Sequence, residues 1–131
     1  MSSDIQNILR SSRTIAVVGL SDKPDRDSYQ VALYLQSKGY QIIPVNPNVV
    51  EILGEKSYSD LKQIPQKIDI VNIFRKKEAV PEIVDEAIAV KAKVVWMQEG
   101  IIHQEAAAKA RLQGLSVVMD KCIKKELYLF N

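Results

Sequence analysis

The sequence is poor in cysteine and histidine. Cys122 is the one cysteine and His103 the one histidine among 131 residues. A single cysteine excludes an internal disulfide framework and argues against a cysteine-based zinc site, so we expect no metal. No apolar run reaches membrane-spanning length, and Met1 to Asp4 lack the basic and apolar regions of a signal peptide. We therefore expect a soluble, cytoplasmic protein with no membrane association.

The sequence also lacks an excess of either charge. Its 18 Lys and Arg residues against 16 Asp and Glu residues give a formal net charge of +2. The basic residues are scattered, so charge does not favour nucleic-acid binding. The one local group, Lys121, Lys124 and Lys125, is interpreted as a solvated helix face. The length suits one domain with a single core, and we expect that domain to cover residues 1–131.

Predicted strands and helices alternate along the chain. The strands are expected at 14–18, 40–46, 68–74, 93–97 and 115–119. The helices are expected at 4–12, 28–38, from 77 or 78 to 88, at 104–112, and in a tail that contains Leu127. Ser28 is a candidate cap for the second of these. The alternation predicts an α/β, Rossmann-like three-layer sandwich, with a five-stranded parallel sheet and helices on both faces. We expect the strand order 3-2-1-4-5, although the near-continuous apolar run at 68–74 suggests a central strand.

The polar loop after the first strand is the candidate site. Residues 14–18 form a short apolar run, and the polar segment from Gly19 to Ser28 leads into the next helix. In an open parallel sheet this loop lies at the carboxyl ends of the strands, where ligands bind. A helix amino terminus offers free N–H donors and a positive dipole end, which suit a phosphate. Lys23 and Arg26 add two cations, so the loop is expected to hold nucleotide phosphates.

Two absences decide which nucleotide is favoured. After Gly19 the chain continues Leu20-Ser21-Asp22-Lys23-Pro24, without the second and third glycines of a dinucleotide fingerprint. The expected second strand ends Pro44-Val45-Asn46-Pro47, without the carboxylate that usually binds the NAD ribose. The P-loop pattern is missing too. A ligand with an extra phosphate on its ribose would avoid a carboxylate there and favour Lys or Arg, and coenzyme A is such a ligand.

Several short motifs, in the right order, resemble those of a known family. They are Gly19-Leu20-Ser21, Pro24 with Arg26-Asp27-Ser28, Pro44-Val45-Asn46-Pro47, Ile52-Leu53-Gly54, Phe74-Arg75, and Trp96-Met97-Gln98-Glu99-Gly100-Ile101. With these motifs the chain resembles the small single-domain CoA-binding proteins of bacteria and archaea. Those proteins are similar in turn to the amino-terminal domain of the succinyl-CoA synthetase alpha subunit. The resemblance covers roughly residues 13–126.

The resemblance implies a set of CoA-binding residues. The Gly19 loop with Lys23 would hold the diphosphate, and Lys23 or Arg26 would face the 3′-phosphate. Asn46 and Pro47 would flank the adenosine. Phe74 and Arg75 would line the pantetheine or adenine path, and Met97-Gln98-Glu99 aligns with a CoA-contacting loop of the synthetase. The full expected set is Gly19, Leu20, Ser21, Asp22, Lys23, Arg26, Ser28, Tyr29, Val45, Asn46, Pro47, Phe74, Arg75, Met97, Gln98, Glu99 and Gly100.

The chain departs from the synthetase because it lacks the domain that carries the phosphohistidine. We therefore expect a CoA or acyl-CoA binder that acts as a carrier, sensor or regulatory protein, with no catalytic residue. Two alternatives remain: an NAD(P)-linked oxidoreductase or its subunit, and an interaction module with a vestigial nucleotide pocket. The sequence leaves open whether a protein partner or a second copy of the chain binds.

Structural interpretations stand beside the functional ones. Gly19 could serve only a tight turn, and Asn46 could only turn the chain before Pro47. His103 has no recognisable catalytic partner, which favours a structural role over acid–base chemistry. Cys122 could form a mixed disulfide with the CoA thiol if it faced the pocket, although a small buried or indifferent cysteine is the commoner case. Phe74 and Trp96 are open to core packing, and Arg75 to the surface.

Overall fold

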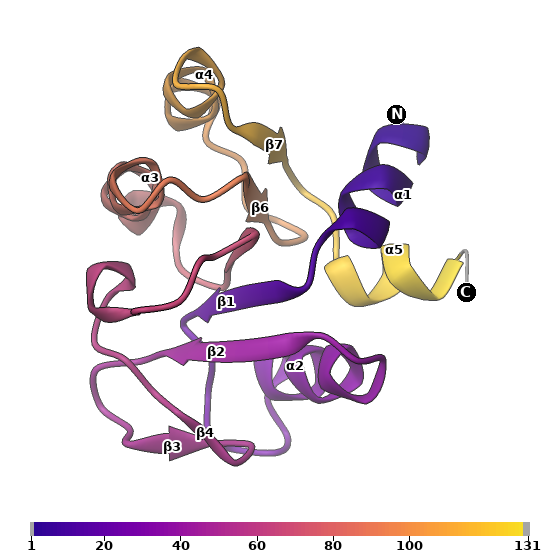
Figure 1. The fold of residues 1–131 in the computed structure, drawn as a ribbon, viewed down its shortest axis with the longest axis vertical. Helices are drawn as coiled ribbons and strands as arrows, with labels where there is room; N and C mark the ends of the chain where they lie inside the picture. Colours follow the sequence, from indigo (N-terminus) through magenta and orange to yellow (C-terminus); the bar gives the residue numbers. More distant parts are fainter. Residues whose placement is uncertain (1, 130–131) are drawn as a thin grey trace.

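A five-stranded parallel sheet forms the centre of the protein, which we describe from a computed structural model (Figure 1). The described part of the chain is residues 2–129, with the backbone alone for Ser2 and Ser3. The sheet strands are β1 (Thr14–Val18), β2 (Gln41–Val45), β5 (Ile70–Ile73), β6 (Val94–Met97) and β7 (Ser116–Val118). Every neighbouring pair is parallel. The predicted α/β class and parallel sheet are confirmed.

The predicted strand order, 3-2-1-4-5, is wrong. The observed order is β2-β1-β5-β6-β7, so the third strand of the sheet along the chain lies between the first and the fourth. β2 is therefore an edge strand. On its outer side the Tyr58 N–H donates to the Pro44 carbonyl at 3.0 Å, and the Asn46 N–H donates to the Tyr58 carbonyl at 2.9 Å. Pro44 thus faces the open edge, where its missing N–H costs no hydrogen bond to another sheet strand.

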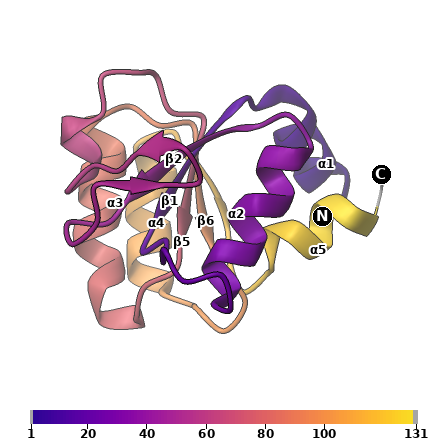
Figure 2. The same cartoon turned by 90° about the horizontal axis from the view of Figure 1, so that it is seen from below.

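Helices cover both faces of the sheet, as predicted, and Figure 2 shows the three layers edge-on. One face carries α1 (Ser2–Ser11), α2 (Asp27–Ser37) and α5 (Ile123–Leu129). The other carries α3 (Val80–Ala89), α4 (Gln104–Leu112) and the 3₁₀ turn η1 (Leu61–Gln63). A second 3₁₀ turn, η2 (Lys77–Ala79), leads into α3, and a small antiparallel hairpin joins β3 (Glu51–Ile52) to β4 (Glu55–Lys56). Among the described helices, none is long and apolar enough to cross a membrane.

Alternate side chains of each strand fill the two cores. Ala16 and Val18 of β1 pack with α3 and α4, whereas Ile15 and Val17 pack with α1, α2 and α5. This period-two alternation follows from strand geometry, and burial on both faces explains why the strands read as continuous apolar runs. All four residues of β5 are buried, which confirms the central position suggested by its sequence. Helix α2 begins at Asp27, so Ser28 lies inside the helix and is not its cap.

Candidate functional site

The candidate site lies at the topological switch point of the sheet, where the strands that follow along the chain are added on the opposite side of β1. From β1 the chain adds β2 on one side and β5, β6 and β7 on the other, so the change falls between β1 and β5. Ligands of open α/β sheets bind in the crevice outside the carboxyl ends of the strands at such a point. Gly19 follows β1 there, and Phe74 and Arg75 follow β5. The residues expected from sequence therefore converge on this edge from different elements.

Gly19 brings the β1 loop into contact with the β5 loop. Its φ is +89°, and a Cβ atom at this position would lie 2.4 Å from the Phe74 carbonyl oxygen and 2.8 Å from Arg75 Cδ. Both the positive φ and the close approach require glycine. The structural interpretation of Gly19 is thus correct, and it explains how the two loops form one surface.

The amides of the β1 loop are largely bonded inside the protein. The Gly19 N–H donates to the Val45 carbonyl at 3.0 Å, and the Ser21 N–H donates to Ser28 Oγ at 3.0 Å. The Lys23 N–H donates to Ser21 Oγ, also at 3.0 Å. These amides hold the loop in shape and are not open donors in this conformation.

The first turn of α2 is a better source of free donors. Within the described residues, the capping position Arg26 makes no side-chain hydrogen bond to the helix. The Gln30 N–H donates to the Arg26 carbonyl at 3.2 Å. The leading N–H groups of an α-helix have no partner within that helix, and together with the dipole they attract an anion. The phosphate-binding potential therefore lies at α2 more than at the Gly19 loop itself.

Asn46 is engaged within the protein. Its Nδ2 donates to the Leu20 carbonyl at 2.9 Å, and its Oδ1 accepts from the Asn48 N–H at 2.9 Å. The side chain therefore turns the chain after β2 and fastens it to the β1 loop, as the structural interpretation expected. The side chains of Leu20 and Met97 are fully buried, so they support the site from beneath. Lys23 and Arg26 are exposed.

A cleft of about 580 Å³ opens between α2 and α5, and we call it the α5 cleft. Four of the expected residues line it: Phe74, Arg75, Gln98 and Glu99. The other lining residues are Asp27, Gln30, Val31, Ile101, Cys122, Lys124 and Lys125. Sequence interpretation missed Lys124 and Lys125 because it treated them as a solvated helix face. Both lysines follow the last strand, at the same end of the sheet as Gly19, and this position in the sequence could have placed them near the site.

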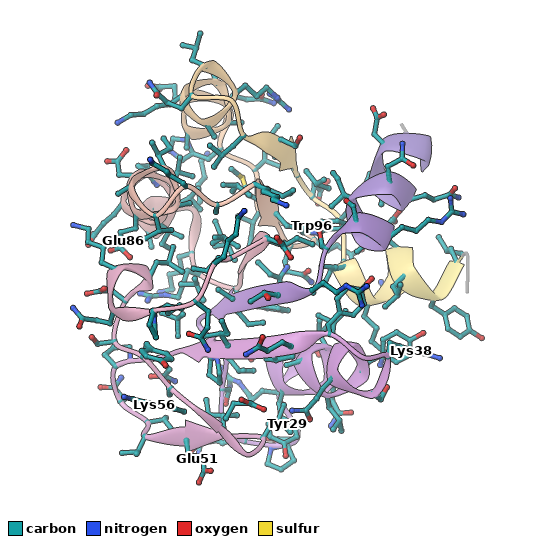
Figure 3. The ribbon with its side chains drawn as sticks, viewed as in Figure 1. Tyr29, Lys38, Glu51, Lys56, Glu86 and Trp96 are labelled. Carbon is teal, nitrogen blue, oxygen red and sulfur yellow. The ribbon has the colours of Figure 1, made fainter. Side chains whose placement is uncertain are left out.

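A second cleft, of about 320 Å³, lies on the other side of Arg75, and we call it the β2 cleft. Of the expected residues, Val45, Pro47 and Arg75 line it. Acidic side chains from other elements also line it, among them Glu86, whose Oε1 accepts from the Leu61 N–H at 3.0 Å (Figure 3). Arg75 thus lines both clefts. A larger hollow of about 690 Å³, beside α1 and β7, is lined by none of the expected residues.

Comparison with known proteins decides the family. A family model described as "CoA binding domain" matches residues 13–128. The chain belongs to this family of CoA-binding domains. The predicted resemblance is confirmed.

Relatives of two kinds share this CoA-binding domain. "Uncharacterized protein YneT" of Bacillus subtilis is 48% identical over 121 residues, which cover 92% of this chain and 90% of that protein. A solved "hypothetical protein" of Pyrococcus horikoshii is 41% identical with a TM-score of 0.95, covering 98% of this chain and 91% of that one. The alpha subunit of acetate–CoA ligase (ADP-forming) I of Pyrococcus furiosus is 32% identical over 126 residues, covering 84% of this chain but only 27% of that subunit.

In this CoA-binding domain a buried polar contact positions α5 beside its cleft. Gln98 Oε1 accepts from the Ile123 N–H at 3.0 Å, at the first residue of α5. Nearby, Trp96 Nε1 donates to the Lys121 carbonyl at 2.8 Å, and the indole points from β6 toward the side of the sheet that carries α1 and α5 (Figure 3). Trp96 is fully buried, so its role is packing.

Two reactive side chains of the CoA-binding domain lie in different settings. His103 Nδ1 accepts from the Ala106 N–H at 3.1 Å, which makes His103 the cap of α4 and supports a structural role. Cys122 is a half-buried free thiol on the wall of the α5 cleft. Across the described residues, no three His, Cys, Asp or Glu side chains gather in a way that could hold a metal ion.

Proposed function

We propose that this protein binds coenzyme A or an acyl-CoA at the carboxyl edge of its sheet and does not by itself catalyse a reaction. The observation that carries the proposal is the pair of clefts that share Arg75, the residue that follows Phe74 after β5. Two hollows that share a lining arginine suit an elongated ligand with an anionic middle better than they suit a compact one. Family membership supplies the ligand class.

Each part of the ligand has a suitable surface along this edge. The uncapped first turn of α2 and the Arg75 guanidinium suit the diphosphate, because backbone N–H groups and arginine both form strong hydrogen bonds to phosphate. The β2 cleft, with Val45 and Pro47, suits the adenosine. The α5 cleft has Phe74 and Ile101 among its lining residues, which suit the largely uncharged pantetheine arm, and also Arg75, Lys124 and Lys125, which suit a phosphate.

NAD is a poorer candidate for the same edge. The NAD ribose is usually bound by a carboxylate after the second strand. Asn46 stands in that region, and both ends of its side-chain amide already bond to Leu20 and Asn48. We therefore expect weaker binding of NAD than of CoA.

The role we propose is that of a carrier, sensor or regulatory protein. The chain covers 27% of the acetate–CoA ligase alpha subunit that it resembles, so the activity of that whole protein does not transfer with the domain. His103, the one histidine, is occupied as a helix cap.

Parallel titration calorimetry with CoA, acetyl-CoA and NAD tests the proposal. Saturable binding of CoA or acetyl-CoA, tighter than that of NAD, is the expected result. Arg75→Met should weaken CoA binding about tenfold, since it removes a guanidinium–phosphate contact. Arg111 is an exposed residue of α4 that lines neither cleft, so Arg111→Met is the matched control and should bind CoA normally. Tighter binding of NAD, or no binding of any of the three ligands, would refute the proposal.

A further inference from the structure

An ion pair crosses from α5 to the loop after β6 at the α5 cleft. Lys125 Nζ lies 2.9 Å from Glu99 Oε1, and both residues line the cleft. Their side chains are 68% and 60% exposed, so solvent reaches both groups. The hydrogen bond and the charge of Glu99 raise the pKa of the Lys125 ammonium above its usual value. Lys125 therefore stays protonated and is already paired with a carboxylate.

The contacts around Lys125 indicate that its present partner is replaceable. Exposed ion pairs contribute little to stability because water screens them and two flexible side chains must be held in place. A phosphate monoester carries more negative charge than a carboxylate, and a diphosphate diester carries two negative charges in all, so either group competes well for an ammonium group. Lys124 and Arg75 line the same cleft and add to the positive charge there.

We propose that Lys125 is a phosphate-binding residue of the α5 cleft and that Glu99 occupies it until the ligand arrives. This inference rests on the proposed CoA function. On binding, a phosphate of the ligand takes the place of the Glu99 carboxylate, which turns to solvent. Glu99 then sets the affinity, because an anionic ligand must displace it and otherwise meets its negative charge. A ligand without a phosphate has no group that could replace the Glu99 carboxylate at Lys125.

This role differs from the one expected for Glu99 from sequence. The resemblance placed Glu99 among the residues that contact CoA, and it assigned the 3′-phosphate to Lys23 or Arg26. Neither Lys23 nor Arg26 is among the residues that line the α5 cleft or the β2 cleft. Glu99 and Lys125 do line the α5 cleft, and there the carboxylate is a competitor of the ligand rather than a contact.

Binding measurements on the wild type and three variants test the exchange. Lys125→Met should weaken CoA binding about tenfold, and Glu99→Gln should strengthen it about threefold, in line with the modest strength of an exposed pair. The gain from Glu99→Gln should be smaller in the Lys125→Met background than in the wild type, because competition for Lys125 is gone and only the repulsion by the Glu99 charge is relieved. Pantetheine, which has no phosphate, should bind all variants equally. Titration of wild type and Lys125→Met with 3′-dephospho-CoA identifies the phosphate. If Lys125→Met no longer weakens binding of this ligand, Lys125 binds the 3′-phosphate; if it still weakens binding about tenfold, Lys125 binds the diphosphate.

A second exposed ion pair provides the matched control. Lys109 Nζ lies 2.6 Å from Asp85 Oδ1, between α4 and α3, and neither residue lines the α5 cleft. Lys109→Met and Asp85→Asn should leave CoA binding unchanged. If wild-type protein binds CoA but Glu99→Gln does not strengthen binding, or Lys125→Met weakens pantetheine as much as CoA, this inference is overturned alone. If wild-type protein binds no CoA, the proposed function falls, and the inference with it.

Discussion

Asn72 donates a hydrogen bond from Nδ2 to Gln98 Oε1 across 2.9 Å in the interior of the protein. The same oxygen of Gln98 accepts from the backbone N–H of Ile123. Both side chains are buried. One acceptor atom therefore connects β5, the end of β6 and the start of α5, and the placement of α5 beside its cleft depends on that atom.

Replacing Gln98 with methionine should destabilise the protein by about 2–4 kcal/mol. The substitution keeps the size of the side chain but leaves the Asn72 amide and the Ile123 N–H without an acceptor, and each unmade buried hydrogen bond costs about 1–3 kcal/mol. Urea denaturation measures the loss. Hydrogen exchange should also accelerate at the first amides of α5, because the bond that holds them is gone.

Asn72→Val is the control for that prediction. Among the described residues, nothing bonds to the buried Asn72 Oδ1, so the native side chain already carries an unsatisfied atom. Valine removes that atom and suits a buried strand, while Gln98 still accepts from Ile123. We expect a stability change within about 1 kcal/mol. A loss as large as that of Gln98→Met would mean that Asn72 Oδ1 has a partner after all.

Gly19→Ala should be more damaging than alanine at another glycine with positive φ. The new Cβ would meet the Phe74 carbonyl, and backbone cannot move away as a flexible side chain can. We expect a loss of about 2–4 kcal/mol, from the left-handed conformation together with the clash. Gly54→Ala is the comparison, because its φ is +78° with nothing within 4 Å, and it should cost only about 1–2 kcal/mol. Equal losses of unfolding free energy for Gly19→Ala and Gly54→Ala in urea denaturation would contradict the close approach of Gly19 to the Phe74 carbonyl.

Asp69 lies just before β5, at the amino ends of the strands, opposite the candidate site. Its contribution to stability depends on pH. Its Oδ2 accepts from the Arg13 N–H at 2.7 Å and from the Thr14 N–H at 3.1 Å, and its Oδ1 lies 3.6 Å from Lys93 Nζ. Burial alone would raise the pKa of Asp69, but the two backbone donors and the Lys93 ammonium outweigh burial and lower it. The ionised carboxylate is therefore the form that stabilises the fold.

The direction of the pH effect follows from that lowered pKa. The stabilisation by Asp69 is complete above the pKa of the unfolded chain, about 3.9, and is lost as the pH falls through the lower folded value. Asp69→Asn should cost about 1–3 kcal/mol at pH 7, and the difference from wild type should shrink below about pH 4. Urea denaturation between about pH 3 and pH 7 measures the stability loss at neutral pH and its decrease in acid. Asp85→Asn, which breaks only an exposed ion pair, should cost less than about 1 kcal/mol.

The sequence predicted the elements well because local periodicity determines them. The continuous apolar runs of β1, β5 and β6 follow from burial on both faces, and all three strands are buried throughout. Local periodicity does not determine the strand order, because two right-handed topologies of the same elements have the same local patterns. Pro44 and the apolar run of β5 held the missing information. A proline in β2 favours an edge, and the near-continuous apolar run of β5, broken by Asn72 alone, favours the centre, which together argue against 3-2-1-4-5.

The sequence predicted the place of candidate residues that depends on topology, and it missed the lining residues that depend on contacts over long sequence distances. Gly19, Phe74 and Gln98 follow strands, and strand ends in a parallel sheet share one edge. Lys125 joins them only because α5 packs beside α2 after the last strand, which no pattern near Gly19 indicates. The internal role of Asn46 was one of two interpretations left open by the sequence, and the bonds of Ser21 were not predicted, because a polar loop side chain can face either ligand or backbone.

His103 offers a last test, between a helix cap and a catalytic group. As the cap of α4, its Nδ1 satisfies the Ala106 N–H, and removing a cap typically costs about 0.5–2 kcal/mol. His103→Ala should show that loss in urea denaturation, while His103→Asn, which supplies another capping oxygen, should retain most of the stability. Both variants should bind CoA as the wild type does, since His103 lines neither cleft. A variant with unchanged stability but weakened binding would instead place His103 in the ligand site.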